Sequence, residues 1–117
     1  MSASAEFKEF IKDQLSGFAP VSIRNMFGGA GVYHDGLMFA LIADDTLYLK
    51  ADSQTSPDFA AEGLKPFEYM GKAEKRMVMA YWRAPEPCLD DPAEMTDWAQ
   101  KAFAAALRAM PKRHASR

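Results

Sequence analysis

The sequence predicts a two-layer α+β domain, in which helices cover one face of an antiparallel sheet. Two observations lead to this fold class. Near both ends of the chain, apolar residues recur at three- and four-residue steps, the period of an amphipathic helix. Between them, apolar segments are separated by turns that contain glycine and aspartate, as in successive hairpins. We expect an antiparallel sheet of about five strands, with the elements in the order α-β-β-β-β-α-β-β-α.

Residues 4–16 are predicted to form the first helix. Ser4 is suited to cap its start, and Gly17 is suited to end it. Charged residues occupy the opposite side, as expected for a helix that lies on a sheet. The apolar residues that fall on one face are Phe7, Phe10, Ile11, Leu15 and Phe18.

Residues 21–50 change period and are predicted to form a meander of antiparallel strands. The dipeptide Asp35-Gly36 lies between two apolar runs, which is a strong hairpin signal. Residues 37–42 are apolar throughout and fit a central strand that is covered on both faces. After a turn in the segment "ADDT", residues 46–50 alternate as the next strand.

The glycines of the segment "NMFGGAGVYHDG" resemble a phosphate-binding loop, but their context excludes one. A dinucleotide-binding loop requires a further glycine at position 34 and a helix behind it. His34 occupies that position, and a strand is predicted to follow. We therefore expect Gly28 and Gly29 to form the corner that joins the first strand to the meander, because glycine permits positive φ and close backbone approach.

The second half of the chain is predicted to contain a helix, a hairpin and a long final helix. Ser56 as cap and Pro57 at the first position predict a short helix over residues 56–62. Residues 66–70 and 76–82 read as two strands, followed by a proline-rich connection. Asp91 is suited to cap the final helix, which Pro111 ends. Its apolar face holds Met95, Trp98, Ala99, Ala102, Phe103, Ala106, Leu107 and Met110.

The composition is that of one ordinary globular domain. We expect residues 1–111 of the 117-residue chain to form it, and the basic tail 112–117 to be disordered. The net charge of −2 argues against a dedicated nucleic-acid-binding domain. No apolar run approaches about 18 residues, and no signal-peptide pattern precedes the first helix. With one cysteine and no disulfide, the chain is expected to be cytoplasmic.

No arrangement of residues in the sequence is typical of a catalytic or metal site. The two histidines, His34 and His114, lie beside a predicted turn and in the tail, without further ligands at metal-binding spacing. Cys88 has acidic neighbours, which raise rather than lower a thiol pKa. We therefore expect no catalytic residue, no metal, no cofactor and no enzymatic activity.

Several segments together resemble the N-terminal domain of the TfoX/Sxy family. They are "SIRNMFGGAGVYHDGLMFALIADDTLYLKAD", "PDFAAEGLKPFEYMGK", "MAYW" and "LDDPAEMTDWAQKAFAAAL", and they extend over roughly residues 7–108 in the family's order and spacing. The resemblance implies a two-layer α+β fold. It also implies binding and regulation rather than catalysis, because some members regulate natural competence in bacteria. Those members carry a second, helical C-terminal domain, which we do not expect here.

Three hypotheses about function remain open. The first is a protein-interaction module, accessory to transcription or to competence-type regulation, with transcription machinery as a candidate partner. The second is nucleic-acid binding, and the third is a small-ligand binder or enzyme with a pocket between sheet and helices. An exposed edge strand also leaves a homodimer open.

The first two hypotheses assign different residues. The protein-contact surface would be the corner and its neighbours: Arg24, Phe27, Gly28, Gly29, Tyr33 and Tyr48. The nucleic-acid surface would be the basic hairpin and tail: Lys72, Lys75, Arg76, Lys112 and Arg113.

Overall fold

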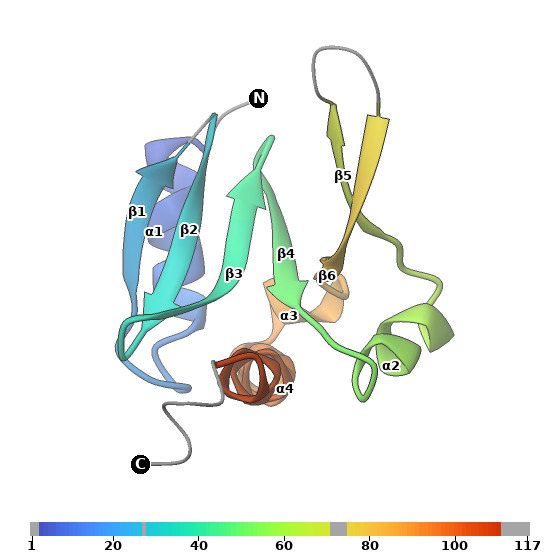
Figure 1. Ribbon diagram of the computed structural model, residues 1–117. Coiled ribbons are helices and arrows are strands. Elements are labelled where there is room, and N and C mark those ends of the chain that lie inside the picture. Colours follow the sequence, from blue (N-terminus) through green and yellow to red (C-terminus); the bar gives the residue numbers. More distant parts are fainter. Residues whose placement is uncertain (1–2, 27, 71–74, 111–117) are drawn as a thin grey trace.

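The computed structural model describes residues 3–26, 28–70 and 75–110 (Figure 1). Within them the fold is α+β, and the predicted order of elements is confirmed with one addition, the short helix α3. The elements are α1 (Ala5–Gln14), β1 (Ser22–Met26), β2 (Gly29–His34), β3 (Leu37–Ala43), β4 (Thr46–Lys50), α2 (Ser56–Ala61), β5 (Pro66–Met70), β6 (Lys75–Arg83), α3 (Pro87–Asp90) and α4 (Pro92–Arg108).

The strands form one antiparallel sheet of six strands in the order β1-β2-β3-β4-β6-β5. The first four strands follow the chain as a meander, and the β5–β6 hairpin joins through β6. The pairing of β6 with β4 uses Tyr81–Arg83 opposite Tyr48–Lys50. The remainder of the hairpin therefore extends past β4, which Figure 1 shows at the right of the sheet.

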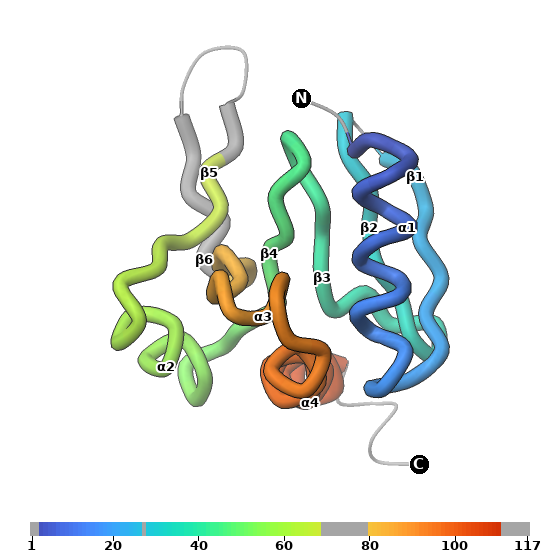
Figure 2. Tube along the Cα trace, turned by 180° about the vertical axis from the view of Figure 1, so that it is seen from behind, coloured from blue at the N-terminus to red at the C-terminus, as the bar shows by residue number. Residues whose placement is uncertain are grey.

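Helices α1 and α4 cover one face of the sheet. Figure 2 shows α1 lying over β1 and β2, with α4 seen end-on below β3 and β4. The buried apolar side chains of the strands come from this face, and alanines of α4 pack against them because their small side chains allow a close approach. The fully buried members of the core include Ile11, Leu15, Val32, Phe39, Ile42, Leu49, Phe59, Met95, Ala99 and Ala102. Burial of this apolar surface is the main stabilising contribution to the fold.

The predicted helix caps are confirmed at two of three helices. The Ser4 hydroxyl accepts a hydrogen bond from the Phe7 N–H at 3.1 Å, and the Asp91 carboxylate accepts from the Ala93 N–H at 3.0 Å. Ser56 is instead the first helical residue of α2, so the prediction that it caps the helix is wrong. Thr55 stands at the cap position, and its hydroxyl accepts from the Asp52 N–H at 3.1 Å in the preceding turn.

The glycine corner between β1 and β2 has the two properties that the sequence predicts. Gly28 has a φ of 73°, a left-handed conformation that favours glycine. Gly29 pairs with Ala43, and a Cβ atom at Gly29 would overlap the carbonyl oxygen of Ile42. Gly28 is therefore needed for the conformation of the turn, and Gly29 for the close approach of the β3 backbone, so both glycines have structural roles.

Two other turns close the meander. Asp35 and Gly36 have φ values of 55° and 77°, and Asp44 and Asp45 have φ values of 56° and 51°. Two successive positive φ angles are those of a type I′ turn, whose twist matches that of the strands. Both predicted turns are therefore confirmed.

Candidate functional site

The sheet face opposite α1 and α4 is lined by aromatic and cationic side chains. The register places Tyr33 opposite Ser22 and Met38, Leu41 opposite Tyr48, and Tyr81 opposite Lys50. Directly opposed residues in antiparallel strands point to the same side of the sheet. We call this surface the aromatic face. It consists of Arg24, Met26, Tyr33, Met38, Leu41, Tyr48, Lys50, Phe67 and Tyr81.

Contacts between strands organise the aromatic face. The Arg24 guanidinium lies 5.2 Å from the centre of the Tyr33 ring, and the Lys50 ammonium lies 5.2 Å from that of Tyr81. These are cation–π distances. The rings of Tyr48 and Phe67 meet edge to face with centroids 4.8 Å apart. Most of these side chains are half-buried, whereas Arg24 is exposed, so the rings keep surface available to a partner.

Two tyrosines of the aromatic face, Tyr48 and Tyr81, have a raised pKa. Burial raises the pKa of Tyr81 to about 12, and Tyr33 adds to the increase. Tyr33 is on β2 and Tyr81 on β6, so this effect acts across the intervening strands β3 and β4. Burial also raises the pKa of Tyr48, against the opposing effect of Arg83 and with that of Asp44. The phenols of Tyr48 and Tyr81 therefore keep their protons at neutral pH and can donate hydrogen bonds.

The structure places part of the predicted contact surface on the aromatic face. Arg24, Tyr33 and Tyr48 lie there, whereas Gly28 and Gly29 lie at the corner beyond the end of β1. Phe27 lies outside the described residues. Sequence reasoning missed the other six members of the surface, although the alternation in residues 46–50 already separates Lys50 from the core. They are Met26, Met38, Leu41, Lys50, Phe67 and Tyr81.

Gly31 is a further residue that sequence reasoning left without a role. A Cβ atom there would lie 2.9 Å from the Met38 sulfur, 3.0 Å from Cε1 of Tyr33 and 3.1 Å from the Met26 sulfur. These three side chains therefore close over the bare backbone of Gly31. The absence of a side chain at this position lets the aromatic face pack tightly.

The residues of the nucleic-acid hypothesis are left untested. Lys72, Lys112 and Arg113 lie outside the described residues. Lys75 and Arg76 belong to β6, but their side chains are also outside the description. The described cations on or bordering the aromatic face are Arg24, Lys50 and Arg83.

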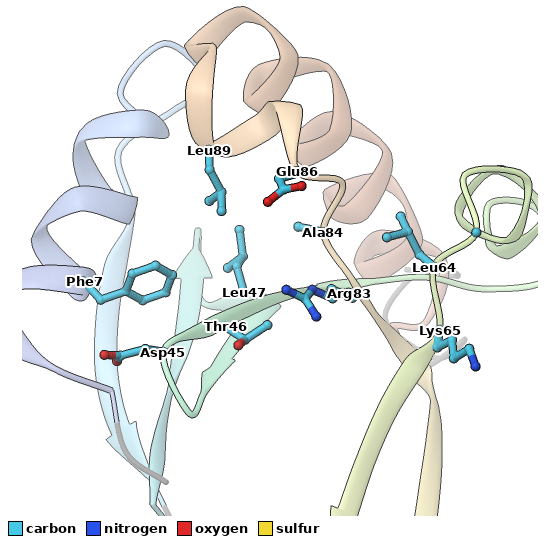
Figure 3. A pocket seen from close by; sticks show the side chains of 11 residues that line it. Phe7, Asp45, Thr46, Leu47, Leu64, Lys65, Arg83, Ala84, Glu86 and Leu89 are labelled. Carbon is cyan, nitrogen blue, oxygen red and sulfur yellow. The ribbon is translucent and has the colours of Figure 1, made fainter.

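A pocket of about 370 Å³ opens at the end of the sheet where α1, α3 and the α2–β5 connection meet (Figure 3). Phe7, Leu47 and Leu89 supply apolar walls, and Arg83 and Glu86 supply charge. The pocket is the candidate cavity for the small-ligand hypothesis, which requires a pocket with polar groups in its lining.

Cys88 has the character of a structural cysteine. It is fully buried, and its thiol donates to the Glu94 carbonyl oxygen at 3.9 Å. Burial, with a further effect of Glu94, raises the pKa of the Cys88 thiol to about 12. Almost no nucleophilic thiolate is therefore present at neutral pH.

We expect Cys88 to resist alkylation in the native protein. At pH 8, iodoacetamide should modify the native thiol at least about a hundredfold more slowly than the thiol of the urea-unfolded chain, because burial restricts both access and ionisation. Mass spectrometry of timed samples measures both rates. Equal rates in the two states would contradict the burial of Cys88.

The same pKa shift predicts a pH dependence of stability. The folded state binds the thiol proton more tightly than the unfolded state, whose pKa is near 9.0. The contribution of the Cys88 thiol to the free energy of unfolding is therefore fully present below pH 9 and is lost as the pH rises towards 12.

Neither a metal site nor a membrane span is found in the part of the chain that the structure describes. Over residues 3–26, 28–70 and 75–110, no three or more His, Cys, Asp or Glu residues are grouped as metal ligands. None of the helices in these ranges combines the length and hydropathy needed to cross a bilayer.

The fold and the aromatic face define a class of protein, a small α+β domain in which helices cover one sheet face and aromatic and cationic side chains line the other. The chain belongs to the TfoX N-terminal domain family, whose model matches residues 13–106. It is also 29% identical over 80 residues to the DNA transformation protein TfoX1 of Aliivibrio fischeri (strain ATCC 700601 / ES114). That match covers 68% of this chain and 38% of the length of the relative.

Proposed function

We propose that this domain is a non-catalytic protein-interaction module in the regulation of DNA transformation, and that it binds its partner with the aromatic face. The observation that carries the proposal is a half-exposed sheet face on which Arg24 and Lys50 lie over the rings of Tyr33 and Tyr81. Membership of the TfoX N-terminal domain family supports the regulatory part, as does the similarity to a protein named for DNA transformation.

Charge indicates what kind of partner fits the aromatic face. The whole chain has a net charge of −2, yet Arg24, Lys50 and Arg83 gather on or beside this face. Asp44, which acts on Tyr48, lies in the turn beyond the strands. A second copy presenting the same face would bring like charges together, which is unfavourable. We therefore assign the face to an acidic protein segment with apolar anchors, whose side chains would pack on the rings.

A charge reversal with a matched control tests this assignment. The probe is a fluorescein-labelled synthetic peptide in which aspartate alternates with leucine and phenylalanine, and anisotropy measures its Kd. Arg24→Glu should weaken binding at least about tenfold, corresponding to about 1.4 kcal/mol. Lys12→Glu makes the same charge change on exposed α1, away from the aromatic face, and should leave Kd within about twofold.

Three outcomes would contradict the assignment. Equal weakening by Arg24→Glu and Lys12→Glu would indicate a general charge effect. Failure of the probe peptide to bind the wild-type domain at low salt would contradict the assignment of an acidic partner. Tighter, strongly salt-dependent binding of a single-stranded oligonucleotide, lost with Arg24→Glu, would assign the aromatic face to nucleic acid instead.

The regulatory part has its own test in the bacterium that carries this gene. Transformation frequency should fall when the chromosomal copy encodes Arg24→Glu, provided that immunoblotting shows an unchanged protein level. An unchanged frequency at an unchanged protein level would contradict a role of the aromatic face in transformation.

A further inference from the structure

The pocket at the end of the sheet is built by parts of the chain that are far apart in sequence. Phe7 comes from α1, Leu47 from β4, Arg83 from the end of β6, and Glu86 and Leu89 from the segment around α3. Figure 3 shows Leu47 and Leu89 pointing toward each other, with the Phe7 ring turned to the same space. A volume of about 370 Å³ lies at the lower end of the range of small-molecule sites.

Charged groups of opposite sign border this apolar space. In Figure 3 the Arg83 guanidinium extends into the middle of the pocket, and the Glu86 carboxylate lies above Leu47. Two other charged residues are directed away from the centre: Lys65 points outward, and the Asp45 carboxylate accepts a hydrogen bond from the Ser4 N–H at 2.7 Å. Arg83 and Glu86 are therefore the charges that a small molecule would meet.

A ligand that matches these groups carries one negative charge, one positive charge and an apolar side chain. Guanidinium binds carboxylate through two parallel hydrogen bonds, and a carboxylate accepts from an ammonium group. A molecule with only one charge would pair with only one of Arg83 and Glu86 and would lack the contact with the other.

We infer that this pocket binds an apolar zwitterion, either a free α-amino acid or a short apolar peptide. The ligand carboxylate binds Arg83, its ammonium group binds Glu86, and its apolar side chain packs against Phe7, Leu47 and Leu89. The site shares Arg83 with the border of the aromatic face, but its other residues are different. The Arg24→Glu test of the proposed function therefore leaves it unaffected, and the probes below test it by themselves.

Titrations of the ¹⁵N-labelled protein followed by NMR test the inference. The probes are L-leucine, L-phenylalanine and the dipeptide Leu-Leu, which together distinguish a free amino acid from a peptide. N-acetyl-leucine lacks the ammonium group and leucinamide lacks the carboxylate, so both should bind at least about tenfold more weakly than their parent. Shifts should occur at Leu47, Arg83 and Leu89.

Two substitutions that each remove one charge show whether each charge acts as assigned. Arg83→Gln should weaken the binding of leucine at least about tenfold but leave the Kd of leucinamide, which has no carboxylate, nearly unchanged. Glu86→Gln should weaken the binding of leucine by a similar factor but leave the Kd of N-acetyl-leucine, which has no ammonium group, nearly unchanged. Arg83 and Glu86 are exposed, so the variants should fold, which their spectra verify. Lys65→Gln removes a rim charge that points outward and serves as the matched control.

The inference is overturned by either of two results. One is the absence of saturable shifts in the wild-type protein with any probe up to about 10 mM, well above a millimolar Kd. The other is an equal effect of Lys65→Gln and Arg83→Gln on leucine, which would mean that general electrostatics and not the assigned pair attract the ligand.

Discussion

Replacing Gly29 with alanine is expected to lower the free energy of unfolding by about 3 kcal/mol, the upper end of the usual cost of overpacking. The added methyl group would overlap the carbonyl oxygen of Ile42, which belongs to the neighbouring strand β3. A backbone oxygen cannot rotate away as a side chain can. Relief therefore requires β2 and β3 to separate where Gly29 pairs with Ala43. Urea denaturation followed by circular dichroism measures the change.

Gly63→Ala is the matched control for this substitution. Gly63 has a φ of 78°, and a Cβ atom there would meet no other atom within 4 Å. Alanine at Gly63 therefore costs only the strain of a left-handed conformation, about 1 kcal/mol. A loss at Gly29 equal to or smaller than that at Gly63 would show that β2 and β3 can separate at little cost.

The local elements of this fold could be predicted because their signals lie within a few residues of the chain. Asp35-Gly36 determines a turn by its backbone preferences alone, and Asp91 caps α4 through a contact two residues away. The short helix α3 was missed because its four residues lie in a proline-rich segment with no measurable period. Thr55 was missed as the residue before α2 because Ser56 offers the same chemistry one position later.

The candidate sites required information that no local pattern contains. Arg24 and Tyr33 lie on adjacent strands joined by one turn, so their proximity follows from the hairpin. Tyr81 reaches the aromatic face only because β6, not β5, pairs with β4. The pocket depends on an even longer connection, since α1 and α3 must both reach the end of β4. Such long-range pairing is selected by the packing of the whole core.

Replacing Gly31 with valine is expected to remove partner binding while leaving the domain folded. The new side chain would displace Tyr33 and the two methionine sulfurs that close over this position. Thioethers are flexible, so we expect a stability loss of only about 1–2 kcal/mol. The displaced Tyr33 ring would no longer lie under Arg24, and the Kd of the acidic peptide should rise about a hundredfold, or about 2.7 kcal/mol.

A second substitution distinguishes displacement of the aromatic face from simple destabilisation. Met38→Ala in the Gly31→Val background removes the sulfur nearest to the new side chain and gives it room. If steric displacement is the cause, the double variant should recover at least about tenfold in affinity relative to Gly31→Val. If the affinity instead follows the free energy of unfolding across the wild-type domain and these two variants, the loss reflects unfolding of the sheet. The aromatic face would then have no special role in binding.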